Sequence, residues 1–178
     1  MNNRSTQLTD YDRWSDIENH HAAWDTRTQL IAQLIPDNAS VFEFGAGRRI
    51  LERYLKPTNK YTPSDIVSRG VGTYVCDLNQ RPLPCFPTHD VAVFSGVLEY
   101  LYGLKTLPSS LSDSFPTVIA SYSIFENTPS MDERRAFGWK NHYCFLDFIQ
   151  LFEQCGYICS ESVYPWKKQI IFVFSLPK

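Results

Sequence analysis

The stretch Val41-Phe42-Glu43-Phe44-Gly45-Ala46-Gly47 decides how this chain folds. An apolar run that carries Glu43 breaks into Gly45 and Gly47, and a helical pattern over 49–55 follows at once. Glycine has no Cβ, so the backbone can turn sharply there and come close to a ligand. A strand, a tight glycine turn and a helix N-terminus, in this order, are typical of a nucleotide site in an open α/β sheet.

Strand and helix patterns alternate on both sides of this turn. Predicted strands cover 41–44, 61–67, 72–75, 90–95, 117–121, 157–164 and 169–176, and predicted helices cover 26–35, 49–55, 96–104 and 145–154. Pro108 marks the limit of the third helix, Gly156 caps the last one, and 124–143 is predicted to be an irregular insertion. The linker 165–168 is too short for a parallel crossover, so the last two strands must be antiparallel.

This pattern of five strands with alternating helices, then a helix and a closing hairpin, predicts a doubly wound α/β fold. The expected sheet is seven-stranded and mostly parallel, with an antiparallel C-terminal strand and helices on both faces. The length of 178 residues favours a single domain over 1–178. We expect an N-terminal helical cap, 1–36, followed by the α/β core, 37–178.

Composition narrows the class of protein. Charged residues make up 20% and aromatic residues 15%, which indicates a globular domain and not a disordered one. The net charge of −2, with no Lys/Arg block, disfavours a nucleic-acid surface. The polar start of the chain lacks the apolar core of a signal peptide, and no apolar run approaches the ~20 residues of a membrane span.

The cysteines indicate the compartment. There are five, an odd number, with no Cys-x-x-Cys and no zinc spacing. Reduced thiols in a cytoplasmic protein are therefore expected. No His/Asp/Glu cluster has metal-ligand spacing either, so no metal is expected.

The predicted strand ends indicate the ligand. In doubly wound sheets the ligand lies beyond the carboxyl ends of the strands, near the point where strand order reverses. Besides the glycine turn, Asp65, Asp77 and Ser95 stand at such ends. An acid after the second strand can accept hydrogen bonds from a ribose diol, and an acid after the third can accept one from an adenine amino group.

The turn itself disfavours a dinucleotide. The sixth position counted from Gly45 is Ile50, where the dinucleotide fingerprint needs a small residue for close helix–strand packing. Glu43 would repel a pyrophosphate but can bind a ligand amino group. The predicted ligand is adenosine-like, with a cationic amino-acid end and no phosphate.

These features resemble the class I S-adenosylmethionine (SAM)-dependent methyltransferases over about residues 38–178. The resemblance rests on 43–47, Asp65, 76–78, 90–100 and the C-terminal hairpin. It implies that the glycine motif cradles the methionine part of SAM, that Asp65 holds the ribose, and that Asp77 with Leu78 reaches the adenine. The implied cofactor-binding set, with S-adenosylhomocysteine (SAH) as the product ligand, is Glu43, Gly45, Ala46, Gly47, Asp65, Ile66, Asp77, Leu78 and Ser95.

Two departures from the family pattern are visible. Arg49 replaces a third glycine, and Leu98-Glu99-Tyr100 stands where many members have Leu-Glu-His. Neither argues against SAM binding, but the second removes a histidine that could have been functional. Structural alternatives also exist: Asp65 as a helix N-cap, Asp77 as a cap of the turn that follows it, and Glu99 as a structural carboxyl.

Two histidines are candidate catalytic residues. His142 lies in the predicted loop after the fifth strand, which usually faces the substrate in this fold. His20 lies on the N-terminal segment, which often covers the SAM cleft in the family. Either side chain can remove a proton from an attacking hydroxyl or amine. The alternative for His142 is that it only positions its loop, and the aromatic residues Trp14 and Trp24 are either lid or packing residues.

The sequence therefore predicts an enzyme that transfers a methyl group from SAM to an oxygen or nitrogen of a small-molecule acceptor. Such a displacement mainly needs alignment in a dry cleft, so a catalytic base is not strictly required. Acceptor recognition is expected from 1–36, from the loop 122–144, or from a partner chain, a second copy included. The alternative is a non-catalytic SAM-binding or partner-binding module of the same fold. RNA methylation is disfavoured by the nearly neutral charge.

Overall fold

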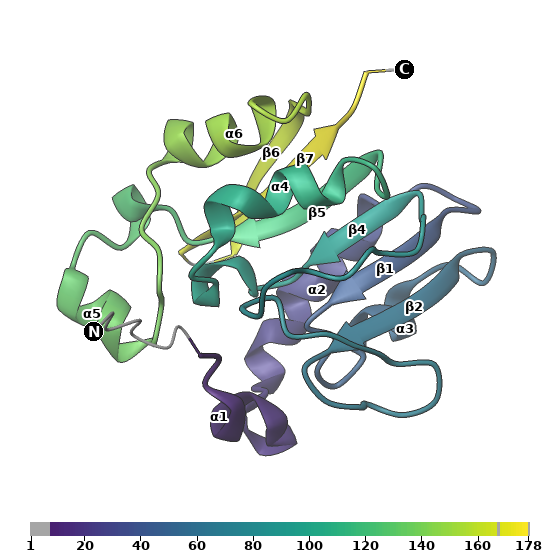
Figure 1. Cartoon of the computed structure of the whole chain (residues 1–178), viewed down its shortest axis with the longest axis horizontal. Coiled ribbons are helices and arrows are strands. Elements are labelled where there is room, and N and C mark those ends of the chain that lie inside the picture. The colour runs from purple at the N-terminus through teal and green to yellow at the C-terminus, as the bar shows by residue number, and fades with distance from the viewer. Residues whose placement is uncertain (1–7, 167, 178) are drawn as a thin grey trace.

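The computed structural model describes residues 8–166 and 168–177, which form a seven-stranded sheet between layers of helices (Figure 1). The strands are β1 (Ser40–Phe44), β2 (Lys60–Asp65), β3 (Tyr74–Val75), β4 (Val91–Phe94), β5 (Thr117–Tyr122), β6 (Ile158–Trp166) and β7 (Gln169–Ser175). The α-helices are α1 (Tyr11–Ser15), α2 (Asp25–Gln33), α3 (Ile50–Tyr54), α4 (Leu107–Leu111), α5 (Met131–Ala136) and α6 (Phe145–Glu153). Short 3₁₀ turns cover Ile17–Asn19, Ala22–Trp24, Leu98–Tyr100, Leu104–Thr106 and Phe125–Asn127.

The sheet has the order β3-β2-β1-β4-β5-β7-β6. The pairs from β3 to β5 are all parallel, whereas β7 runs antiparallel to both β5 and β6. The predicted fold class and the predicted antiparallel hairpin are therefore confirmed. After β1 the chain proceeds outward to β2 and β3, then returns to place β4 on the other side of β1. Strand order thus reverses beside β1, where the glycine turn begins.

Two apolar layers hold the sheet. On one face α4 and α6 cover an aromatic core in which Phe44 stacks on Phe94 at 4.6 Å and Phe152 on Phe174 at 4.0 Å between ring centroids. On the other face α2 and α3 pack against the small β-branched side chains of the strands. Burial on both faces explains the continuous apolar runs of β1 and β4.

The N-terminal cap predicted over 1–36 divides into two parts among the described residues. Helix α2 packs on the sheet through Ile31, Ala32 and other apolar residues, so it belongs to the core. We call residues 8–24 the lid. Its three short helical turns contain no buried residue. The lid therefore lies over the carboxyl ends of the strands without contributing to the apolar core.

The predicted helix over 96–104 is wrong. That stretch forms 3₁₀ turns at Leu98–Tyr100 and Leu104–Thr106. Asn141 Nδ2 donates to the carbonyls of Leu98 and Leu101 at 2.7 and 2.9 Å, so carbonyls that an α-helix would use are already bound.

Other boundaries also differ from the prediction. Pro108 lies in the first turn of α4 and does not end a helix, because the first turn needs no N–H from it. The alternation of strands and helices fails between β2 and β3 and between β3 and β4, where the described chain has no helix. Strand β2 ends at Asp65. The predicted insertion contains the short helix α5, and we call residues 123–143 the wall loop.

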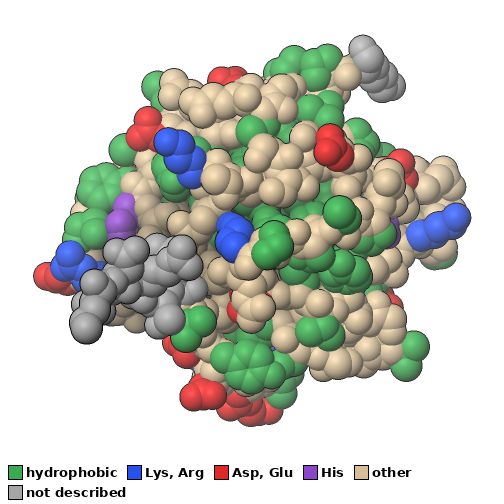
Figure 2. Space-filling model, in the orientation of Figure 1, with side chains coloured by type: hydrophobic (Ala, Val, Ile, Leu, Met, Phe, Trp, Pro, Cys, Tyr) green, Lys and Arg blue, Asp and Glu red, His purple; other side chains and the backbone are tan. Residues whose placement is uncertain are grey.

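The surface carries no single dominant charge on the face that Figure 2 shows. Acidic and basic side chains are spread over it, with some acidic side chains gathered near α1. Within the part of the chain that the structure describes, no helix has both the length and the apolar character needed to cross a bilayer.

Candidate cofactor site

The glycine turn is shaped for close approach. Gly45 and Gly47 have φ of +67° and +48°, in the left-handed region that favours glycine. A Cβ on Gly45 would lie 2.5 Å from Val97 Cγ2, and one on Gly47 would lie 2.4 Å from His20 Nδ1. Larger residues are excluded at both positions by backbone conformation and by space.

Arg49, the departure from the family's third glycine, adopts the left-handed conformation that a glycine would take, with φ of +55°. Its guanidinium donates to Glu52 at 2.9 Å and to the Val71 carbonyl at 3.2 Å. These contacts offset the strain of a non-glycine residue at this φ. Helix α3 therefore still starts at Ile50, immediately after the turn.

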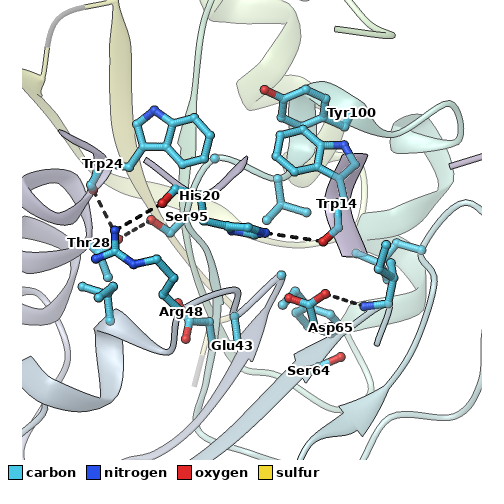
Figure 3. A pocket seen from close by; sticks show the side chains of 18 of the residues that line it. Trp14, His20, Trp24, Thr28, Glu43, Arg48, Ser64, Asp65, Ser95 and Tyr100 are labelled. Carbon is cyan, nitrogen blue, oxygen red and sulfur yellow. Dashed lines mark hydrogen bonds between the residues drawn. The ribbon is translucent and has the colours of Figure 1, made fainter. Parts of the chain in front are cut away.

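A cavity of about 140 Å³ opens at the carboxyl ends of β1 to β4, between the strand ends and the lid (Figure 3). Of the predicted cofactor residues, the cavity is lined by Glu43, Gly45, Ala46, Asp65, Ile66, Asp77, Leu78 and Ser95. Gly47 does not line the cavity, but its N–H donates a hydrogen bond to Asp65, which does. Residues distant in sequence are thus brought together where the sequence predicted a ligand.

Asp65 is buried and fully oriented. Its Oδ2 accepts the Gly47 N–H and its Oδ1 accepts the Ile66 N–H, both at 2.8 Å. Arg69 Nε lies 3.3 Å from Oδ2, and both side chains are less than a tenth exposed. Since this Nε–H forms no hydrogen bond within the described chain, the pair is held by charge. The carboxylate is fixed at the end of β2, against the glycine turn.

Asp77 is held in a similar way at the end of β3. Its Oδ1 accepts the Asn79 N–H at 2.9 Å and the Thr9 hydroxyl at 2.6 Å. The first contact is the cap of the following turn that the sequence offered as an alternative. The second contact comes from the lid. Leu78 and Cys76, both buried, supply an apolar surface beside this carboxyl.

Glu43 forms the floor of the cavity and is 2% exposed. The Tyr61 hydroxyl donates to its Oε2. Burial raises the pKa of Glu43 to about 8, although the Tyr61 hydrogen bond acts in the opposite direction. Below that pH the carboxyl is mostly neutral, so it presents little negative charge to a ligand.

A buried arginine faces Ser95 at the end of β4. Arg27 of α2 donates through Nε to Ser95 Oγ at 3.0 Å and through Nη2 to the Ser95 carbonyl at 2.9 Å. Thr28 exchanges a 2.9 Å hydrogen bond with the same hydroxyl. Both Arg27 and Thr28 line the cavity. Arg27 was not predicted from the sequence, where only its position in an otherwise apolar helix stripe could have indicated a buried cation.

His20 lies in the cavity, above the glycine turn (Figure 3). Its Nε2 is 3.4 Å from the Trp14 carbonyl. Burial lowers the pKa of His20, and the positive charge of Arg69 acts in the same direction. The ring is therefore neutral near pH 7 and can contact a bound ligand or accept a proton.

Aromatic rings complete the cavity roof. Trp14 packs edge-on against Tyr100 at 4.6 Å between ring centroids, and lies 6.4 Å from Trp24. His21 packs against Trp24 at 5.1 Å. Tyr100 stands where the family often has histidine, and here it supports the lid. The lid interpretation of Trp14 and Trp24 in the sequence analysis agrees with these contacts.

His142 does not line this cavity. Its Nδ1 accepts a hydrogen bond from Arg134 Nε at 2.9 Å, which occupies that lone pair. Burial and the charge of Arg134 lower the pKa of His142. The structure thus places His142 in the wall loop, beside Arg134.

Glu99 is fully buried. Its carboxyl accepts hydrogen bonds from the Ser123 N–H and from the Gln169 amide, and these partners suit a structural role.

A metal site is not formed by the described residues 8–166 and 168–177, which contain no group of three His, Cys, Asp or Glu side chains able to hold an ion. All five cysteines are free thiols.

No protein-family model matches the chain, and no curated protein matches it in sequence. Its fold is similar to that of solved methyltransferases. A candidate O-methyltransferase from Nostoc punctiforme is 16% identical, with a TM-score of 0.72 over 97% of this chain and 63% of that one. This chain therefore spans less than two thirds of that protein.

Two further structures match over more of their own length. The 1,6-didemethyltoxoflavin-N1-methyltransferase of Burkholderia thailandensis, solved with its substrate and SAH, is 15% identical, with a TM-score of 0.67 over 94% of this chain and 84% of that one. A chain of the Haloferax volcanii complex between the Trm112 methyltransferase activator and a candidate methyltransferase is 12% identical, with a TM-score of 0.66 over 96% and 99%. Topology, the glycine turn and these matches together show that the chain has the fold of the class I SAM-dependent methyltransferases.

Proposed function

We propose that this chain is a SAM-dependent methyltransferase that acts on an oxygen or nitrogen of a small-molecule acceptor. The observation that carries the proposal is the convergence of the glycine turn, Asp65 and Asp77 on one cavity. A ribose diol and an adenine amino group are hydrogen-bond donors, and two carboxylates held at neighbouring strand ends are the acceptors they need. The similar toxoflavin enzyme, which was solved with SAH, supports this choice of ligand.

The residues around the cavity fit SAM part by part. Asp65 would hold the ribose, and Asp77 with Leu78 would hold the adenine. The buried hydroxyl of Ser64, which is 1% exposed, lines the cavity and has no hydrogen-bond partner within the described chain. Buried polar atoms are rarely left unpaired, so this hydroxyl supports a polar ligand beside Asp65.

The methionine end has a matching partner on the opposite wall. Arg27 presents a buried positive charge near the end of β4, where the α-carboxylate of the amino-acid end would lie. Glu43 was predicted to bind the amino group. Its pKa of about 8 leaves it largely neutral at pH 7, so the positive charge of a bound ammonium would have to lower this pKa and Glu43 would have to release its proton to solvent. That role for Glu43 stays a prediction.

When bound, SAM supplies a methyl group activated by a sulfonium. The chain's own task is alignment and exclusion of water. The rings of Trp14, Trp24 and Tyr100 line the cavity over the strand ends and would help to exclude water once SAM is bound. His20, neutral near pH 7, is the candidate base within the cavity, whereas His142 would need its loop to rearrange before it could act.

Acceptor recognition is proposed to come from the lid, the wall loop or a partner chain. The aromatic roof favours an acceptor with an apolar or ring-shaped body. A partner is a reasonable proposal because one similar fold occurs in a complex with an activator. The five free thiols support action in a reducing compartment such as the cytoplasm.

Calorimetric titration with SAH tests the proposal, with NAD as the control ligand. We expect micromolar binding of SAH and no binding of NAD. Asp65→Asn should weaken SAH binding by roughly 10- to 100-fold, since a hydrogen bond to a charged group contributes about 1.5–3 kcal/mol. The matched control is Asp132→Asn, whose side chain is 95% exposed on α5. If the wild-type protein does not bind SAH, the proposed function fails.

A further inference from the structure

Arg69 touches both the proposed ribose site and the lid. It lies in the loop between β2 and β3, where the described chain has no helix, and its side chain is 7% exposed. On one side its Nε pairs with Asp65 Oδ2 at 3.3 Å. On the other side its Nη1 donates to the Ser15 carbonyl at 2.9 Å and its Nη2 donates to the Trp14 carbonyl. No other described side chain pairs with a predicted SAM carboxylate while donating to lid carbonyls.

These contacts of Arg69 can couple the Asp65 carboxylate to the lid backbone. The guanidinium is planar and rigid, so the position of its Nε edge fixes the direction of its two Nη groups. Asp65 itself is oriented by the glycine turn through the Gly47 N–H. A continuous path therefore runs from the glycine turn through Asp65 and Arg69 to the backbone at Trp14 and Ser15. A ligand that hydrogen-bonds to Asp65 therefore contacts a group that is tied through Arg69 to the lid.

We propose that Arg69 is a positioning residue that couples occupation of the ribose site at Asp65 to closure of the lid. The inference rests on the proposed function and names the regulation of that same site. Arg69 holds the carboxylate for the ribose and at the same time holds the lid backbone over it. Binding of the adenosine part then stabilises the closed lid, and through it the dry cleft that methyl transfer needs.

Two substitutions separate the two halves of this role. Arg69→Met removes both the ion pair and the carbonyl contacts. Arg69→Lys keeps a positive charge near Asp65, but an ammonium on a flexible stem cannot replace a fork that reaches two carbonyls and a carboxylate together. Arg53→Lys, on the exposed surface of α3, is the matched control.

The readout is hydrogen exchange of the amides of residues 8–24, measured with and without saturating SAH, together with calorimetric affinity for SAH. In the wild type we expect SAH to slow lid exchange by about tenfold or more, the effect of about 1.4 kcal/mol of added protection. Arg69→Met should lose both SAH affinity and SAH-dependent protection. Arg69→Lys should weaken SAH binding by about five- to tenfold, less than Arg69→Met, while protection by SAH falls below about twofold, because coupling between lid and ligand is reciprocal.

A merely structural role for Arg69 predicts something different. It would speed lid exchange in the absence of SAH but leave the slowing by SAH unchanged. That result, or full SAH-dependent protection in Arg69→Lys, would overturn the inference. Failure of the proposed function is distinguishable, since wild-type protein would then show no SAH affinity. Affinity without any lid protection in the wild type would refute only the coupling.

Discussion

The wall loop (123–143) and the lid (8–24) both use guanidinium groups to hold backbone carbonyls, but only one of them is part of the buried structure. Arg134 belongs to the wall loop, is fully buried, and donates to the carbonyls of Ser123, Ile124, Thr128 and Asn141. The lid takes its main anchor, Arg69, from the β2–β3 loop, and its helical turns bury no residue. The same hydrogen-bond chemistry thus gives a fixed wall in one place and a movable cover in the other.

Burial explains the difference. Opening the wall loop would break several hydrogen bonds to a charged donor and expose Ile124, which packs in the main apolar core. Opening the lid would break a few polar contacts that water can replace, and would expose rings that are already partly accessible. Segments held mainly by polar contacts at the surface open at lower free energy than core segments do.

Of the substitutions considered, Arg134→Met is expected to change the free energy of unfolding most. It should lower the free energy of unfolding by about 3 kcal/mol, because several buried carbonyls lose a charged donor at once. Urea unfolding followed by circular dichroism measures the change. The control is Arg135→Met. The Arg135 side chain is 69% exposed and pairs with the exposed Asp132, so this variant should stay within about 0.5 kcal/mol of wild type. A loss in Arg134→Met as small as in this control would show that the wall loop is no more fixed than the lid.

The sheet and the strand ends of the site were predictable because they depend on local patterns. Gly45 and Gly47 indicate a turn with positive φ, which favours glycine. The apolar runs indicate strands that are buried on both faces. Asp65 and Asp77 follow from the rule that parallel strands end at one edge. The hydrogen bond of Asp77 to Thr9 of the lid, and the link from Asp65 through Arg69 to the lid, did not follow from any pattern.

The parts that were not predictable depend on contacts distant in sequence. Arg27 meets Ser95 across 68 residues, and Arg69 meets the lid across 54 or more. The 3₁₀ turns at 98–106 depend on the Asn141 amide, about forty residues away, which binds their carbonyls. A single sequence gives no signal for such pairs, since each residue alone is compatible with an ordinary surface position.

Glu43, on the cavity floor beneath the lid, tests whether the lid keeps water out of the cavity. Its pKa is raised from an ordinary 4.5 to about 8 by burial. Between these values the folded protein keeps a proton that the unfolded chain releases. The contribution of Glu43 to the free energy of unfolding is therefore greatest below about pH 4.5. It falls as the pH rises toward 8 and stays constant above that pH.

Glu43→Gln should remove this contribution while keeping an oxygen for the Tyr61 hydroxyl. The slope of unfolding free energy between pH 5 and 8 should become flatter than in wild type by up to about 1.4 kcal/mol per pH unit. Urea unfolding at several pH values measures the slope, and Glu153→Gln, an exposed change on α6, should leave it unchanged. Parallel wild-type and Glu43→Gln profiles would mean that water reaches Glu43, as it would beneath an open lid.

Arg13→Met gives the smallest effect on global stability and tests the lid itself. Arg13 Nη1 donates to the Phe137 carbonyl at 3.0 Å, a contact on the exposed surface that joins the lid to the wall loop. Because global unfolding breaks the same contact, its loss should lower the free energy of unfolding by no more than about 1 kcal/mol. Opening of the lid alone should become easier by about 1 kcal/mol, the usual contribution of one hydrogen bond.

Hydrogen exchange separates these two quantities. In Arg13→Met the lid amides should exchange about fivefold faster than in wild type, whereas amides of the wall loop and of β1 should be unaffected. Arg53→Met, on exposed α3, is the control. Equal acceleration in lid and wall loop would mean that the two segments open as one unit. The distinction between a fixed wall and a movable cover would then be wrong, because the lid could not respond to a ligand without the wall loop moving with it.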